Sequence, residues 1–229
     1  WFIYPISLVG VSILVVLFLP FCHLPDYAAS LKNIDVKYTK NLKTPLYNWI
    51  LWVFLIIVVM YAFAEGTFSN WAVVYLNENR GIPLTTASLA LSAFWAMIAM
   101  GRLLVSVLLI KVSSQSIWLF LPVLMIAAFF MMPFATNGLA GILLFSLAGL
   151  ACSAFFPLSV DLVTKQFPVH AALVSSIMMA ALMTGVGIGS YTIGSLRSLF
   201  PMENLYQISA VYPALVLLFI TILKIKSKK

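Results

Sequence analysis

Charge is what this sequence has least of. Only 8% of its 229 residues are charged, with six acidic residues against 13 lysines and arginines. A water-soluble domain of this length needs far more polar surface to stay dispersed, so the composition excludes a soluble globular protein. Hydrophobic residues make up 63% of the chain, and the mean hydropathy is +1.10. The sequence therefore predicts an all-α integral membrane protein.

Residues that hold metals, nucleotides or disulfides are also scarce. Cys22 and Cys152 are too few for a disulfide framework and have no metal-ligand spacing, and His23 and His170 lie far apart. The stretch "TGVGIG" (Thr184–Gly189) follows no predicted strand and lacks the full glycine spacing of a nucleotide loop, and close helix packing explains its G-x-x-x-G pattern. We therefore expect no enzyme, no cofactor and no metal ion. The basic balance indicates membrane topology, so no nucleic-acid partner is expected either.

Seven stretches are long and apolar enough to cross a bilayer as helices, which takes about 20 residues each. The predicted spans are Trp1–Cys22, Leu46–Leu76, Leu84–Ile110, Ile117–Phe134, Leu139–Val160, Ala171–Gly194 and Gln207–Leu223. The connections between most of them are short, so little of the chain is left for a soluble domain.

The lysines fall on one side of this topology. They lie in the first loop, in two later alternate loops and in the tail: Lys32, Lys37, Lys40, Lys43, Lys111, Lys165, Lys224, Lys226, Lys228 and Lys229. The opposite loops carry only Arg80 and Arg197 as basic residues. The positive-inside rule places the lysine side in the cytoplasm, with Trp1 outside and Lys229 inside. The predicted location is the plasma membrane, which in a bacterium is the inner membrane.

The longest polar stretch, His23–Thr44, divides the first span from six closely spaced ones. We interpret 1–22 as the last helix of an absent N-terminal half, 23–45 as a basic cytoplasmic linker, and 46–229 as a six-helix bundle with a short basic tail. In each consecutive three of these six spans, the third has few or no polar side chains. This pattern agrees with the 3+3 inverted repeat of many secondary transporters, and we expect the two third helices to be outer, lipid-facing supports.

Glu65 lies inside an otherwise apolar span. An acid at that depth costs free energy, so it is rarely present without a function. The helical rise places Trp95, Ser146 and Thr184 at nearly the same depth, with Tyr61 one turn from Glu65 on its face. A carboxylate, two aromatic rings and two hydroxyls at one level predict a binding site for a polar molecule. For Ser146 and Thr184 taken singly, hydrogen bonding along or between helices is the simpler explanation.

Arg102 is the other charge well inside a span, about 7–8 Å to the cytoplasmic side of its helix centre. A direct pair with Glu65 is not expected, because the two would have to bridge about 12 Å of depth. Two interpretations of Arg102 stay open: a gating role, and a side chain that extends to the inner interface.

Three stretches resemble one known family. "YAFAEGTFSNWAVVYL" (Tyr61–Leu76) is similar to the seventh helix of the fucose–galactose–proton symporter branch of the major facilitator superfamily, and "SAFWAMIAMGRLL" (Ser92–Leu104) to its eighth. "FPVHAALVSS" (Phe167–Ser176) resembles the link from the tenth to the eleventh helix. With its basic linker and tail, the whole chain resembles the C-terminal half of such a transporter, with Trp1–Cys22 as the sixth helix.

The resemblance places five residues on family positions: Tyr61, Glu65, Trp95, Gly101 and Arg102. The loop after Arg102 departs from the superfamily's Asp-Arg-x-Gly-Arg pattern, since only Lys111 follows it. The family implies a six-helix bundle of the same type and transport of a small solute, with a sugar as the class suggested by the branch.

The hypothesis that follows is secondary active transport by alternating access, with a substrate bound between two halves near the midplane. Tyr61, Glu65, Trp95, Ser146 and Thr184 are the predicted substrate-binding residues, and Glu65 either accepts hydrogen bonds from substrate or exchanges a proton. Because no ATP motif exists, the energy must come from a gradient of protons or another coupling ion. One alternative is efflux of a drug or cation that pairs with Glu65. Another is a non-transporting seven-helix receptor or scaffold.

The lysine asymmetry generates a topology prediction. In a cysteine-free version, single cysteines at Lys37→Cys and Asn79→Cys should react with an impermeant thiol reagent from opposite sides of the membrane. Intact cells should label the Asn79→Cys variant alone, and opened cells should label both. Labelling of both variants on intact cells contradicts the arrangement.

Overall fold

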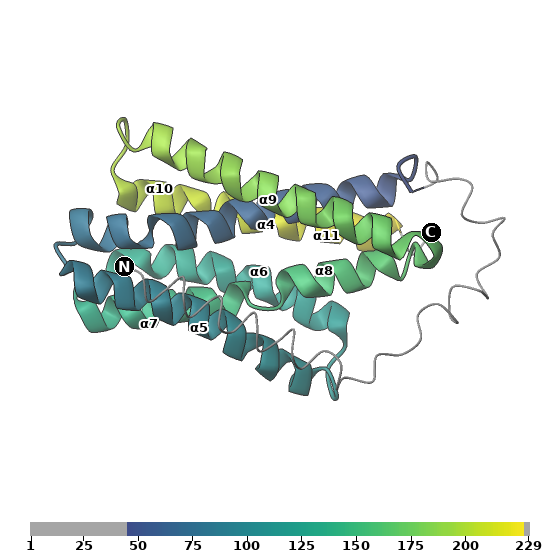
Figure 1. Cartoon of the computed structure of the whole chain (residues 1–229), viewed down its shortest axis with the longest axis horizontal. Helices are drawn as coiled ribbons and strands as arrows, with labels where there is room; N and C mark the ends of the chain where they lie inside the picture. The colour runs from purple at the N-terminus through teal and green to yellow at the C-terminus, as the bar shows by residue number, and fades with distance from the viewer. Residues whose placement is uncertain (1–44, 227–229) are drawn as a thin grey trace, which may run out of the picture. The chain divides into compact units, whose positions relative to one another are not determined.

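Six long apolar helical spans make up the part of the protein that the computed structural model describes, residues 45–226 (Figure 1). The elements in chain order are α4 (Trp49–Val74) with the π-helical η2 (Tyr75–Asn79), α5 (Leu84–Leu108), α6 (Ser114–Met131) with η3 (Met132–Phe134), α7 (Gly138–Cys152), α8 (Phe155–Thr164), η4 (Pro168–His170) with α9 (Ala171–Leu196), α10 (Met202–Ser209) and α11 (Val211–Lys226). Within residues 45–226 there is no strand, which confirms the all-α fold class. The predicted first span and nearly all of the predicted linker lie outside the described residues.

The last span begins earlier than the sequence predicted. Its first helix, α10, starts at Met202, inside a stretch that we expected to be a loop before Gln207. Polar residues lower the hydropathy of this segment, but one face of α10 is buried, with Met202, Leu205, Tyr206 and Ser209 at helical spacing. Amphipathic spacing, which a search for long apolar runs does not detect, therefore accounts for the difference.

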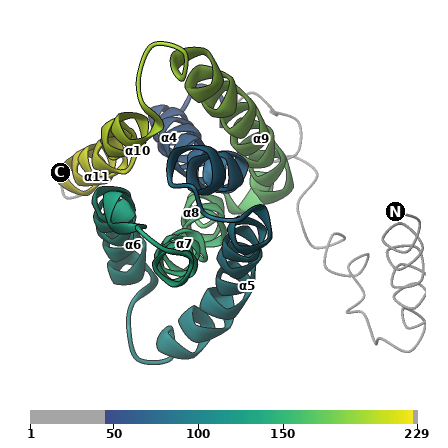
Figure 2. The same cartoon turned by 90° about the vertical axis from the view of Figure 1, so that its left-hand side faces the viewer.

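The two groups of three helices pack on each other symmetrically. The first group is α4, α5 and α6, and the second is α7 with α8, α9, and α10 with α11. The first member of each group packs against the second member of the other, as α4 on α9 and α7 on α5. It also packs against the other group's third member, as α4 on α11 and α7 on α6 (Figure 2). This exchange is the contact pattern of an inverted repeat, and it agrees with the 3+3 arrangement predicted from the polar content of the spans.

The second helix of each group is the least buried. In the most apolar stretch of each span, 22% is buried for α5 and for the span of α9. The same share is 39% to 56% for the other four spans. The third helices, α6 and α11, pack on α4 and α7 and are more buried than we expected of outer supports. The open surfaces of the described bundle therefore lie on α5 and α9.

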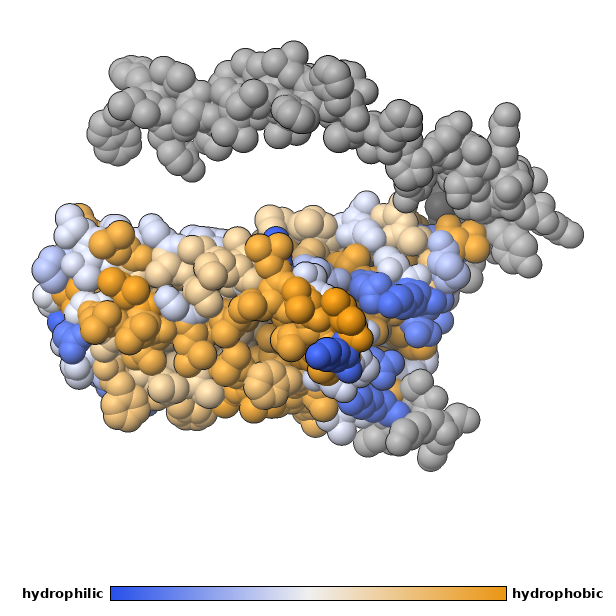
Figure 3. Space-filling model, turned by 90° about the horizontal axis from the view of Figure 1, so that it is seen from below, coloured by the Kyte–Doolittle hydropathy of each residue, from blue (hydrophilic) through white to orange (hydrophobic). Residues whose placement is uncertain are grey.

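Hydrophobic side chains cover the middle of the bundle, and hydrophilic residues gather toward its two ends (Figure 3). One end holds Lys111, Lys165 and Lys224, and we refer to it as the lysine end. The other holds Arg80 and Arg197, at the far ends of α4 and α9, and is called the arginine end. An apolar belt between two polar ends is the surface of a protein that spans a bilayer.

Close contact between α4 and α9 depends on the G-x-x-x-G pair of α9. A Cβ atom added at Gly185 would lie 2.6 Å from the Cβ of Ala62, and one at Gly189 would lie 2.9 Å from the Cα of Phe63. Only a residue without a side chain fits at such distances. This confirms helix packing as the explanation of "TGVGIG".

Substitution of Gly185 should separate the two helices. We expect Gly185→Ala to lower the stability of the detergent-purified protein by about 1–3 kcal/mol, because the new methyl group overlaps Ala62 and the Val59 carbonyl. Gly187→Ala is the matched control, since nothing lies within 4 Å of a Cβ added there. Thermal unfolding should show a lower midpoint for Gly185→Ala alone. Equal midpoints for the two variants contradict the assigned contact.

Candidate functional site

The span formed by α7 and α8 is broken near its middle, where the sequence predicted a continuous helix from Leu139 to Val160. The helix α7 ends at Cys152, and α8 begins at Phe155. Pro157 explains the position of the break. Proline has no N–H to donate to the carbonyl four residues earlier, that of Ser153, and its ring occupies the space of that hydrogen bond.

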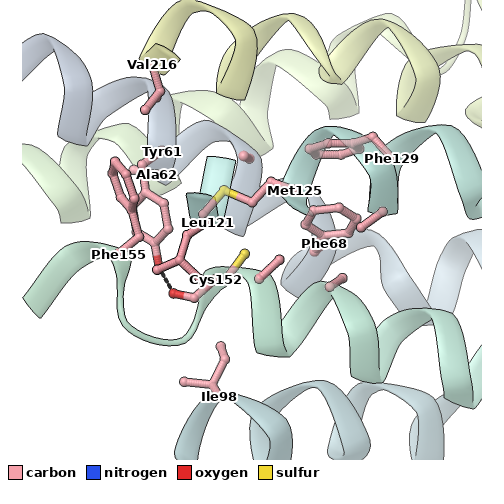
Figure 4. Close-up of a cluster of buried hydrophobic side chains, with 14 of the residues drawn as sticks. Tyr61, Ala62, Phe68, Ile98, Leu121, Met125, Phe129, Cys152, Phe155 and Val216 are labelled. Carbon is pink, nitrogen blue, oxygen red and sulfur yellow. Dashed lines mark hydrogen bonds between the residues drawn. The ribbon is translucent and has the colours of Figure 1, made fainter. Parts of the chain in front are cut away.

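The carbonyl groups freed by the break are bonded by side chains from two other helices. The Tyr61 hydroxyl of α4 donates a hydrogen bond to the Cys152 carbonyl, with an O–O distance of 2.9 Å (Figure 4). From α5, Arg102 Nε donates to the Ser153 carbonyl at 3.1 Å. A buried carbonyl without a donor is costly, so both side chains stabilise the break. Tyr61 and Arg102, predicted as substrate-binding and gating residues, thus meet at one structural feature.

The α5 helix reaches the break because small residues line its contact with α7. A Cβ added at Gly101 would lie 2.5 Å from the Ser153 side chain, and one at Gly149 would lie 2.2 Å from the Phe94 carbonyl oxygen. The absence of a side chain at Gly101 lets the neighbouring Arg102 approach the Ser153 backbone.

Glu65 lies one helical turn from Tyr61 and is half-buried. The Tyr61 hydroxyl and the charge of Arg102 both lie close enough to Glu65 to act on its carboxyl group electrostatically. Among residues 45–224 the ion pairs are Arg80–Glu203, Lys165–Asp161 and Arg197–Glu78. A direct Glu65–Arg102 pair is not among them, as the depth argument predicted.

Tyr61 and Trp95, the two predicted aromatic residues, lie in different surroundings. Tyr61 is only 2% exposed and stacks on Phe155, with ring centroids 5.0 Å apart (Figure 4). Trp95 is 49% exposed and contacts the edge of Phe94. The structure therefore makes Trp95 accessible to a ligand and encloses Tyr61 in the core.

The two predicted hydroxyls are also placed differently from each other. Ser146 is half-buried, and its Oγ donates to the Ile142 carbonyl of its own helix at 2.7 Å, which agrees with the simpler explanation of this residue. Thr184 is exposed on α9. Because Gly185 packs on Ala62, Thr184 lies about one turn nearer the lysine end than Glu65, not at the same depth.

Exposed polar residues form a line along α5, and we call this line together with Glu65 the polar face. Its members share one side of the helix by their spacing of three, four or seven residues: Ser88, Ser92, Trp95 and Arg102. Because Arg102 bonds Ser153, the line borders the α7–α8 break. Viewed end-on, α8 lies between α5 and α9 (Figure 2). Polar groups at the depth of a bilayer core normally face protein or a water-filled cavity, so the polar face is the candidate functional surface.

A comparison with protein families agrees with this arrangement. Residues 54–229 match the Major Facilitator Superfamily. The chain belongs to this superfamily. A comparison with curated proteins gives no match. Members of the superfamily carry solutes across membranes, so the protein is a multi-pass transporter of a small-molecule substrate and not an enzyme by class.

A hydrogen-bond network at the arginine end of the transporter was missed by the sequence analysis. Tyr75 is fully buried. Its hydroxyl donates to the Met132 carbonyl at 2.9 Å and accepts from Arg80 at 3.0 and 2.9 Å. Arg80 also pairs with Glu203 of α10 at 3.1 Å. The π-helical turn η2, which places Tyr75 and Arg80 together, has no signal in the sequence.

A second contact joins the same end of α4 to the end of α9. Arg197 donates to Glu78 at 2.7 Å, and its guanidinium lies over the Trp71 ring, 5.6 Å from the centroid. Arg80 and Arg197, which served only as a topology signal in the sequence, are therefore each paired with an acid of another helix. These pairs lie at the arginine end, so they do not change the placement of Lys111, Lys165 and Lys224 at the lysine end.

Removal of the Tyr75 hydroxyl should destabilise the arginine end. Tyr75→Phe removes one of two donors to the Met132 carbonyl, which keeps the Ala135 N–H, and one acceptor of Arg80, which keeps Glu203. We expect a loss of about 2 kcal/mol in the free energy of unfolding. Tyr191→Phe is the control, because this tyrosine is 77% exposed. Thermal unfolding in detergent should lower the midpoint for Tyr75→Phe only. An unchanged midpoint shows that water replaces both hydrogen bonds.

Proposed function

We propose that this transporter carries a small polar solute, with a sugar as the first candidate class, by proton-coupled alternating access. The observation that supports this proposal is the position of Glu65, a half-buried acid in an apolar helix, beside the hydroxyl of Tyr61 and within the field of Arg102. An intramembrane acid on such a surface marks a substrate or proton pathway.

The residues of the polar face have separate roles in this proposal. Glu65 accepts hydrogen bonds from substrate hydroxyls or exchanges a proton with the cavity. The exposed ring of Trp95 offers a flat apolar surface on which a sugar ring can stack. Thr184, exposed one turn nearer the lysine end, is available to a substrate that extends in that direction. Arg102 acts as a gating residue because it bonds the break between α7 and α8.

Two predicted binding residues contribute less directly. The Tyr61 ring is enclosed in the core. In this conformation its hydroxyl stabilises the site indirectly, through the hydrogen bond to the Cys152 carbonyl. Ser146 bonds its own helix and keeps acceptor capacity only. We assign neither residue a first contact with substrate.

A second bundle completes the site in this proposal. The exposed polar line on α5 would be costly against lipid, and a first half of the transporter would cover it. Residues 1–22 then form the last helix of that half, and 23–45 the linker. The lysine end faces the cytoplasm, and the membrane is the plasma membrane, which is the inner membrane in a bacterium.

Efflux of a cation is the second candidate, and one observation favours it. Glu65 lies outside the three ion pairs of residues 45–224, so its carboxylate can pair with a charged compound. Membership of a transporter superfamily leaves the receptor or scaffold hypothesis without support.

Substitution of Glu65 distinguishes these functions. Glu65→Gln keeps the size and hydrogen bonding of the side chain but removes the titratable charge, so the protein should insert and fold as before. If Glu65 carries the proton, gradient-driven accumulation is lost while substrate exchange survives, because exchange moves no net proton. If Glu65 only binds substrate, both assays lose affinity. If it pairs with a cation, charged compounds stop moving while neutral ones continue.

Glu78→Gln is the matched control for this experiment. Glu78 is an exposed acid at the arginine end, and an ion pair in such a position contributes little. Accumulation, exchange and cation efflux should all persist in that variant. If they persist in Glu65→Gln as well, the carboxylate is a packing or hydration feature and the proposed site is wrong.

A further inference from the structure

Two possible acceptors for the single hydroxyl hydrogen of Tyr61 lie near it, the Cys152 carbonyl and the Glu65 side chain. A phenol donates one hydrogen bond, and in this structure the hydrogen of Tyr61 goes to the Cys152 carbonyl at 2.9 Å. Toward Glu65 the hydroxyl can therefore offer only a lone pair. A lone pair accepts from a protonated carboxyl group, which carries a hydrogen, but it is repelled by an ionised one.

Ionisation of Glu65 must change this arrangement. A carboxylate only accepts hydrogen bonds, so the nearby Tyr61 hydroxyl has to turn its hydrogen toward Glu65 to bond it. The Cys152 carbonyl then loses its donor. No backbone N–H of a continuing helix replaces this donor, because α7 ends at Cys152 and the next helix begins only at Phe155.

We propose that Tyr61 is a positioning residue that transmits the charge of Glu65 to the α7–α8 break, holding the break closed when Glu65 is neutral and releasing it when Glu65 is charged. This inference rests on the proposed function, since it explains how a proton on Glu65 changes the shape of a helix. It assigns Tyr61 no contact with substrate. The Arg102 bond to Ser153 holds the same break from α5.

Few other charged or titratable groups reach this place from the helices that surround α4. Arg102 comes from α5, and the Cys152 thiol, which interacts electrostatically with Glu65, comes from α7. On α8 the charged residues are Asp161 and its partner Lys165. At or near the two ends of the bundle stand His170 and Arg197, which flank α9, and Glu203 and Lys224 of the last span. Two tyrosines contact α4 itself: Tyr206 donates to the Thr67 carbonyl, and the ring of Tyr212 packs at a right angle to that of Phe63.

Hydrogen–deuterium exchange of the full-length transporter tests the coupling. The probe is the peptide that covers Leu150–Leu158, measured across about pD 5 to 9 and corrected for intrinsic exchange. In the unaltered protein we expect exchange of this peptide to rise about fivefold or more as Glu65 ionises, because release of the break lets the amide groups beside it open more often. Peptides of α6 should show no such step.

Three variants separate Tyr61 from its neighbours. Glu65→Gln should keep the peptide protected at every pD, since its amide can donate to Tyr61 as the neutral acid does. Tyr61→Phe keeps the stacking on Phe155 and should exchange fast at every pD without a step. Asp161→Asn, the control acid nearest to the peptide, should retain the step.

The outcomes decide the proposal in both directions. A step that persists in Tyr61→Phe, or that is absent from the unaltered protein, overturns the role of Tyr61. Arg102→Gln should exchange faster throughout and still show the step, and loss of the step in this variant assigns the coupling to Arg102 instead. Transport assays distinguish the proton role of Glu65 from the coupling role of Tyr61. If Glu65→Gln abolishes accumulation while Tyr61→Phe retains the exchange step, the proton role of Glu65 stands and the coupling role of Tyr61 fails.

Discussion

One missing hydrogen-bond donor organises the centre of the described bundle. Pro157 has no N–H, so the helix breaks between α7 and α8. The break frees backbone carbonyls in an apolar environment, where no water can bond them. Tyr61 and Arg102 reach those carbonyls from α4 and α5, and in doing so they fix three helices around a single point. Glu65 lies one turn from that point. The chemistry proposed for the site therefore depends on the backbone geometry at the break as well as on the acid itself.

The symmetry of the bundle explains why a surface suited to transport remains open. Each first helix packs on the second and third helices of the other group, which buries α4 and α7 and leaves α5 and α9 with large exposed sides. Glycines at the α4–α9 and α5–α7 contacts bring these helices close together. The same packing that stabilises the fold therefore presents the polar face at membrane depth, where a solute or a second bundle can reach it.

Much of the architecture follows from local sequence properties. Hydropathy is enough to find six spans in the described residues, because a bilayer requires a run of about 20 apolar residues wherever a helix crosses. The G-x-x-x-G of α9 was correctly assigned to helix packing. The start of the last span was predicted wrongly, because the buried face of α10 is amphipathic. The burial of Tyr75, whose hydroxyl bonds the Met132 carbonyl, was not predicted. Both cases concern residues whose burial depends on a segment distant in sequence.

The sequence by itself determined that this is a membrane protein, where its helices cross, and that Glu65 is an acid in apolar surroundings, because these properties depend on composition and on neighbours along the chain. Only the tertiary structure decided that Tyr61 bonds a carbonyl 91 residues away, and that Trp95 is exposed while Tyr61 is enclosed. It also decided that Thr184 lies one turn from the level of Glu65. These relations depend on the angles and offsets at which helices pack, and helix packing is set by side-chain contacts between segments that the linear order keeps apart.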